Sequence, residues 1–127
     1  MILGIGLDLC EISRIQRAIE KEHFLARVFT DAEQARIRGA SDIRRGEIAA
    51  GLFAAKEAVA KALGTGFVGF GTADIEIAPD ALGRPQCALR GGAAARAEQL
   101  AGHSAYRMFV SITHEAGMAA ATAILEV

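Results

Sequence analysis

Several residue types are scarce in this chain of 127 residues, and each scarcity excludes a class of protein. The sequence contains two cysteines, two prolines, one tyrosine and no tryptophan. Two isolated cysteines are too few for a disulfide framework or a zinc site, and they suit a reducing compartment. No basic leader opens the chain, and no apolar run approaches the roughly 18 residues that a membrane span requires. We therefore expect a soluble cytoplasmic protein that does not contact a membrane.

Net charge is scarce as well, because 14 basic and 15 acidic residues leave a formal charge of −1. A nearly neutral protein has no overall field that attracts nucleic acid or anionic lipid, so electrostatic recognition must be local. Hydrophobic residues reach 52%, which is high for a chain long enough for only one small domain. We predict one domain over residues 1–127, with part of its surface buried against another subunit.

The periodicity of apolar residues predicts an α+β fold, with helices packed on a mainly antiparallel sheet. A capping box at Thr30 and Glu33 predicts a helix start, and Ser13 is a candidate cap for an earlier helix. The polar residues 36–45 are expected to form a connection or a frayed helix end. The expected strands cover residues 2–9, 73–78, 86–89, 107–113 and 118–125, and the expected helices cover residues 13–22, a segment from residue 30, a long segment ending at residue 64, and residues 93–100.

The most informative segment covers residues 53–66, which have the pattern of a helix followed by a glycine-rich turn. Its apolar residues form one stripe, and Glu57 and Lys61 lie on the opposite side, one turn apart. Gly64 and Gly66 flank Thr65, so a ligand could approach this backbone closely. Spacing alone favours a plainer interpretation, in which Glu57 and Lys61 form an ordinary ion pair on a solvated face.

Two further residues lie where strands are expected to end. Asp8 shares one face of the first strand with Gly4 and Gly6, and the two glycines leave that face clear of side chains. His114 lies at the turn between the last two strands. Each residue also has an ordinary structural explanation: a turn hydrogen bond for Asp8 and a satisfied polar contact for His114.

A basic stripe, formed by Arg14, Arg17 and Lys21, lies roughly opposite the apolar edge of the predicted helix 13–22. Its members are three and four positions apart, and no acidic residue interrupts them. Such stripes are usually solvated helix faces, although here the charges are clearly segregated by sign.

Five motifs occur in a characteristic order along nearly the whole chain. They are Gly6-x-Asp8 with Arg14-Ile15, Phe29-Thr-x-x-Glu33, Phe53-x-x-Lys56-Glu57-Ala58-x-x-Lys61-Ala62-x-Gly64-Thr65-Gly66, Leu82-Gly-Arg-Pro85, and Ser111-Ile-Thr-His114-Glu115. Together they resemble holo-acyl-carrier-protein synthase, the small bacterial type of 4′-phosphopantetheinyl transferase. The chain has Thr113 where serine is usual, Arg84 where lysine is more frequent, and Met118 where an aromatic residue is common. Each of these keeps the hydroxyl, the charge or the apolar character.

The resemblance implies that the phosphopantetheine arm of coenzyme A is transferred to a serine of apo acyl carrier protein, in support of fatty acid biosynthesis. It implies that Asp8 and Glu57 bind Mg²⁺ and that Lys61 stabilises charge on the leaving phosphate. It leaves open whether Glu57 or a metal-bound water accepts the serine proton. The implied coenzyme A contacts are Lys61, Gly64, Thr65, Gly66, Arg84, Pro85 and His114, with Lys56 as a weaker candidate.

The resemblance also implies a homotrimer with active sites at the subunit interfaces. The basic stripe would then dock the acidic acyl carrier protein. Two other functions use the same residues. One is a Mg²⁺-dependent hydrolase of nucleotides or phosphate esters, and the other is an oligomeric binding module without turnover. Neither explains why the five motifs occur together.

Overall fold

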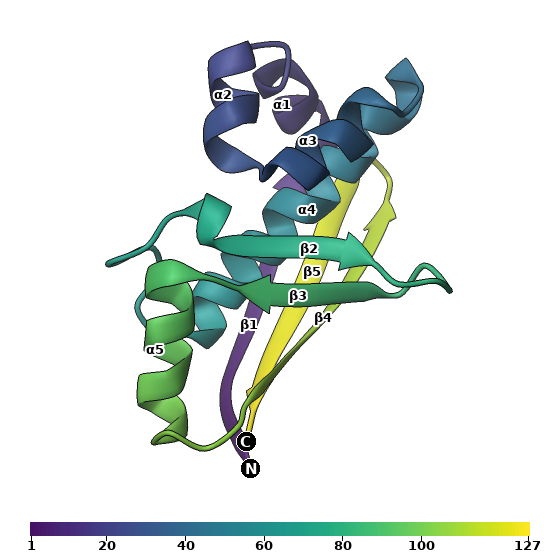
Figure 1. Cartoon of the computed structure of the whole chain (residues 1–127). Coiled ribbons are helices and arrows are strands. Elements are labelled where there is room, and N and C mark those ends of the chain that lie inside the picture. Colours follow the sequence, from purple (N-terminus) through teal and green to yellow (C-terminus); the bar gives the residue numbers. More distant parts are fainter.

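In the computed structural model of residues 1–127, one long helix lies between a three-stranded antiparallel sheet and a two-stranded hairpin (Figure 1). The elements are β1 (Ile2–Glu11), α1 (Ile12–Ala18), α2 (Glu22–Val28), α3 (Asp31–Arg38), α4 (Asp42–Ala62), the 3₁₀ helix η1 (Thr72–Asp74), β2 (Ile75–Pro79), β3 (Pro85–Leu89), α5 (Gly91–Ala101), β4 (Arg107–Glu115) and β5 (Met118–Glu126). The larger sheet has the order β1-β5-β4, and β2 pairs with β3. This arrangement confirms the predicted α+β fold with antiparallel strands.

Helix α4 is buried along most of its length. Many of its residues are alanine or glycine, and these small side chains let neighbouring elements pack closely around it. Its alanines pack against the alanines of β5, which allows the helix and the sheet to approach closely. The fully buried members on the two elements are Ala49, Ala50, Ala54, Ala55, Ala58, Ala119 and Ala123. The high alanine content therefore serves the core of this chain itself.

Strand β1 contacts α4 backbone to backbone, and its glycines make this possible. A Cβ atom on Gly6 would overlap the carbonyl oxygen of Ala58 and lie 2.7 Å from its carbonyl carbon. A Cβ on Gly4 would overlap the carbonyl oxygen of Ala62. The prediction that the glycine face of β1 is clear was therefore wrong, because α4 covers it.

The opposite face of β1 is apolar and exposed. Ile5, Leu7 and Leu9 alternate along the strand and are 70%, 65% and 63% exposed. No helix of this chain covers that face of the sheet (Figure 1). A row of large exposed aliphatic side chains is typical of a surface that a partner covers.

The N-terminal helices differ from the sequence prediction. Helix α1 begins after Glu11 without a side-chain cap, so Ser13 does not cap it. The helix ends at Ala18, and a separate helix, α2, follows from Glu22 to Val28. The apolar period of three to four residues continues across the break, which explains why the sequence pattern alone did not reveal two helices.

The remaining element predictions are largely confirmed. Thr30 and Glu33 form the predicted capping box at the start of α3. Helix α4 begins at Asp42, so the expected connection 36–45 is only a short link between two helices. The strands and the short alanine-rich helix of the C-terminal half lie within one or two residues of the expected bounds. None of the helices has the length and apolar character needed to cross a membrane.

Candidate active site

The contact between β1 and α4 brings Asp8 and Lys61 together. The Lys61 Nζ atom donates a hydrogen bond to the Leu7 carbonyl at 2.8 Å and lies 3.3 Å from Asp8 Oδ1. The Asp8 side chain is only 16% exposed, whereas the Lys61 side chain is 53% exposed. Lys61 therefore pairs with Asp8 rather than with Glu57, so the plainer interpretation of an ordinary Glu57–Lys61 ion pair is not what the structure shows. About half of the Lys61 side chain stays exposed, where a ligand can reach it.

Glu57 lies one helical turn before Lys61 and belongs to the same cluster. Burial raises the pKa of the Glu57 carboxyl, and the charge of Asp8 raises it further. Lys61 and Arg14 act in the opposite direction on this pKa. Asp8 and Glu57 thus repel each other electrostatically at the edge of the β1–α4 contact, and a bound cation would relieve this repulsion.

The donor set fits Mg²⁺. Two carboxylates supply hard oxygen ligands, and Mg²⁺ is commonly held by one or two carboxylates together with water and substrate phosphate. The chain contains no group of three or more His, Cys, Asp or Glu side chains arranged to hold a metal. Nearby Cys10 does not change this assignment, because burial and the charge of Asp8 raise the pKa of its thiol.

The predicted glycine turn comes directly after the end of α4. Gly64 and Gly66 have positive φ angles of 82° and 63°, which side-chain-bearing residues rarely adopt. The Thr65 hydroxyl donates to the Gly66 carbonyl at 3.0 Å. A Cβ atom on Gly66 would meet nothing within 4 Å, so the backbone here is open to a ligand.

The other predicted coenzyme A contacts, namely Arg84, Pro85 and His114, lie apart from the cluster of Asp8, Glu57 and Lys61. Pro85 and His114 line a cavity of about 190 Å³, and Arg84 belongs to the same hairpin turn. The cavity is lined by Arg36, Arg44, Glu47, Ile48, Gly51, Leu52, Pro79, Gly83, Pro85, Ile112 and His114. Asp8, Glu57 and Lys61 are not among its lining residues. One chain therefore presents the predicted site residues as two separate groups.

Two arginines of this cavity were missed in the sequence. Arg36 and Arg44 lie at the end of α3 and the start of α4, within the segment that was interpreted as a connection. The four arginines within residues 36–45 were the sequence signal that could have indicated an anion-binding segment. Arg36 and Arg44 bring two positive charges to the cavity, and the one lining carboxylate, Glu47, lies 3.7 Å from the His114 Nε2 atom.

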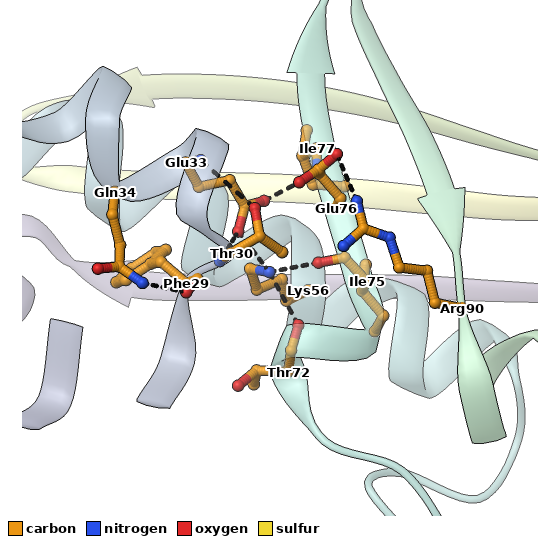
Figure 2. Close-up of polar contacts among 10 residues, drawn as sticks. All are labelled: Phe29, Thr30, Glu33, Gln34, Lys56, Thr72, Ile75, Glu76, Ile77 and Arg90. Carbon is orange, nitrogen blue, oxygen red and sulfur yellow. Dashed lines mark hydrogen bonds and ion pairs between the residues drawn. The ribbon is translucent and has the colours of Figure 1, made fainter. Parts of the chain in front are cut away.

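The suggestion that Lys56 contacts coenzyme A is wrong. Its side chain is completely buried, and its ammonium group forms an ion pair with Glu33 (Figure 2). Lys56 and Glu57 are neighbours in the sequence, but the helix turns them about 100° apart. Lys56 therefore points into the protein interior and cannot touch a ligand.

The three residues of the basic stripe are exposed, but they do not share one helix as predicted, because Arg14 and Arg17 lie on α1 and Lys21 comes just before α2. The Arg14 guanidinium lies 5.8 Å from the centroid of the Phe53 ring. Phe53 precedes Glu57 by one turn of α4, and Arg14 lowers the pKa of Glu57. None of the three stripe residues forms an ion pair within the chain, so their charge is available to a partner.

Comparisons with family models, protein sequences and solved structures all indicate the same family. A model of the 4′-phosphopantetheinyl transferase superfamily matches residues 4–121. The holo-[acyl-carrier-protein] synthase of Clostridium acetobutylicum is 44% identical over 128 residues, covering 100% of this chain and 99% of the relative. Among solved structures, the holo-[acyl-carrier-protein] synthase of Neisseria meningitidis has a TM-score of 0.85 at 34% identity, with all of both chains covered. That of Bacillus anthracis, in complex with CoA (3′,5′-ADP), has a TM-score of 0.82 at 33% identity, covering 99% of this chain and 97% of its own.

Proposed function

The chain belongs to the 4′-phosphopantetheinyl transferase superfamily, and on this basis we propose that it acts as a holo-acyl-carrier-protein synthase. It would transfer the 4′-phosphopantetheine arm of coenzyme A to a serine of an apo acyl carrier protein and release adenosine 3′,5′-bisphosphate. The observation that carries the proposal is the cluster of Asp8, Glu57 and Lys61 at the β1–α4 contact. It lies within the residues that match the family model.

The chemistry of the transfer explains why these residue types are needed. The serine oxygen forms a bond to the β-phosphorus of coenzyme A, and the bond from that phosphorus to the bridging oxygen breaks. Negative charge then accumulates on the departing bisphosphate, and catalysis consists mainly of positioning and charge stabilisation. Lys61, held beside Asp8 and half exposed, can stabilise that charge. The serine proton would pass to Glu57 or to a water molecule.

Asp8 and Glu57 would hold Mg²⁺, which supplies charge neutralisation at the diphosphate when it is bound. The mutual repulsion of the two carboxylates supports this assignment. The open backbone at Gly64, Thr65 and Gly66 would accept the nucleotide end of coenzyme A.

We further propose that the protein forms a homotrimer in which the two groups of site residues meet across a subunit boundary. The support is that Arg84, Pro85 and His114 lie apart from the carboxylates within one chain. Leu7 and Leu9 also flank Asp8 in β1 and expose an apolar face. This face lies on the side of β1 opposite to Asp8, and it offers a neighbouring subunit an apolar surface to cover.

The basic stripe gives the acidic carrier protein a docking surface beside the reacting groups. Its first member, Arg14, is close enough to influence Glu57, so a carrier docked there would present its serine near the carboxylates. We place the activity in the cytoplasm and in fatty acid biosynthesis, and the two free thiols, Cys10 and Cys87, are compatible with a reducing compartment.

Intact mass spectrometry tests the proposal directly. Apo acyl carrier protein is incubated with this protein, coenzyme A and Mg²⁺, and a parallel sample contains a chelator. We expect the carrier to gain the mass of one phosphopantetheine group only when metal is present. A folded protein that binds coenzyme A but leaves the carrier mass unchanged would favour the binding-module alternative. Release of nucleotide without carrier modification would favour the hydrolase.

A further inference from the structure

A buried ion pair joins four segments of the chain that are distant in sequence (Figure 2). Lys56 Nζ lies 2.7 Å from Glu33 Oε1 and donates hydrogen bonds to the carbonyl groups of Thr72, at 2.8 Å, and Ile75. All three ammonium hydrogens therefore have acceptors. The pair connects α3, α4, η1 and β2, and the catalytic cluster does not use it.

Glu33 completes the network from the other side. Its Oε1 atom accepts the backbone N–H of Thr30 at 2.9 Å, and Oε2 accepts the backbone N–H of Ile77 at 2.8 Å. The side chains of Glu33 and Lys56 are 1% and 0% exposed. Burial lowers the pKa of the Lys56 ammonium, and the Glu33 carboxylate opposes this. The charges are thus retained inside the protein because each one is fully hydrogen-bonded.

The network takes the place of a strand on one edge of β2. Backbone groups of alternate residues point to the same edge of a strand, so the Ile75 carbonyl and the Ile77 N–H lie side by side. Strand β3 pairs with the other edge, and no strand pairs with this one. Lys56 and Glu33 therefore supply the donor and the acceptor that a neighbouring strand would otherwise supply.

This attachment fixes two elements of the proposed coenzyme A site. The Thr72 carbonyl follows the loop of residues 64–71 directly, so Lys56 holds the far end of that loop to α4. Ile77 is two residues before Pro79, which lines the 190 Å³ cavity together with Pro85 across the hairpin. Glu57, the residue after Lys56, lies on the same rigid helix. The ion pair therefore sets the position of the loop and of the hairpin relative to the carboxylates.

We propose that Glu33 and Lys56 are positioning residues for coenzyme A, holding the 64–71 loop and the β2–β3 hairpin in place against α4. The inference rests on the proposed function. Stability alone does not require such a pair, because apolar residues of similar volume often replace a buried ion pair without loss. An apolar pair would, however, leave the Ile75 and Thr72 carbonyls without donors, and the loop would lose its attachment.

The test uses the full-length protein with the double substitution Glu33→Gln and Lys56→Met, which removes both charges and the ammonium donors. Ile37→Ala is the matched control, because Ile37 is buried on the same helix as Glu33 but has no part in the network. We expect the double variant to raise KM for coenzyme A at least about tenfold, whereas kcat and KM for the carrier change less than about threefold. Ile37→Ala should lower the melting temperature without this KM effect.

A second variant and a second readout keep the inference open to refutation. Glu33→Gln keeps the shape and one oxygen acceptor but leaves the buried Lys56 ammonium without its counter-charge. It should therefore lower the melting temperature and raise KM for coenzyme A at least about threefold. Hydrogen exchange of residues 64–77 should accelerate in the variants but not in Ile37→Ala. A folded Glu33→Gln protein with unchanged KM and exchange overturns the inference. Unmodified protein that modifies no carrier overturns the proposed function instead, and the exchange measurement still reports on the attachment.

Discussion

Gly6→Ala is the sharpest perturbation that the structure suggests, because one methyl group must separate β1 from α4. The new Cβ atom would overlap the Ala58 carbonyl oxygen and lie 2.7 Å from the Ala58 carbonyl carbon and 2.9 Å from the Ala62 nitrogen. Carbon atoms pack at roughly 3.5–4.0 Å. The obstacle is backbone rather than a flexible side chain, so the strand and the helix must move apart by about 1 Å.

This separation of β1 from α4 should lower both the catalytic rate and the stability of the protein. Asp8 would move away from Lys61 and Glu57 by a similar amount, and a misplacement of about 1 Å can lower the catalytic rate about 100-fold. Overpacking of this kind costs about 1–3 kcal/mol of stability, which lowers Tm by roughly 4–12 °C in a domain of this size. The loss of activity should therefore be visible in protein that is still folded at 25 °C.

The assay is the rate of holo carrier protein formation, followed by intact mass, together with a thermal melt of each variant. Gly4→Ala should cost similar stability, because it meets the Ala62 carbonyl, but it should lower activity less since it lies farther from Asp8. Gly39→Ala is the control: its backbone is helical, with φ −76° and ψ −10°, and a Cβ there would meet only backbone oxygens of α3, the nearest at 3.2 Å, so it should leave activity unchanged and cost little stability. A Gly6→Ala protein with unchanged kcat/KM would refute the argument that this contact positions the site.

Three further predictions follow from the same geometry. Glu57→Gln should abolish transfer yet raise Tm at pH 7, because the folded state raises the pKa of Glu57 above its ordinary 4.5. Ionisation of Glu57 then destabilises the native protein as pH rises, so the Tm difference between the two proteins should vanish near pH 4. Arg14→Glu should raise KM for the carrier protein at least about tenfold and leave coenzyme A binding by calorimetry nearly unchanged, and equal effects on both substrates would argue against docking. The Asp8→Asn and His114→Ala proteins should each be inactive alone. After the two are dissociated, mixed and reassembled, up to about a quarter of full activity should return, because about a quarter of the shared interfaces would combine an intact Asp8 with an intact His114. A mixture that stays inactive would place each site within one subunit.

Much of this protein could be predicted from its sequence, because local patterns carry their own physical signals. The capping box at Thr30 and the two short strands of the hairpin were predicted because each depends on residues close together in the chain. The spacing of Glu57 and Lys61 likewise fixed their common helix face. The ordered motifs indicated the family, which the comparisons then confirmed.

The tertiary structure decided the features that depend on contacts between segments distant in the sequence. The glycines of β1 look like open space in the sequence, but they are where α4 makes contact, and that contact is what brings Asp8 to Lys61. Lys56 carries the same charge as Lys61 and lies only five residues away, yet the rotation of the helix buries one and exposes the other. The helical period already separates the two lysines, since Lys56 follows Leu52 by four positions and lies on the apolar side of α4. It does not show that the partner of Lys56 is Glu33, 23 positions earlier in the chain. The sequence alone therefore determined the residue types and their local geometry, and the packing of α4 between the sheet and the hairpin determined which lysine reaches solvent beside the carboxylates and which one holds the fold around them.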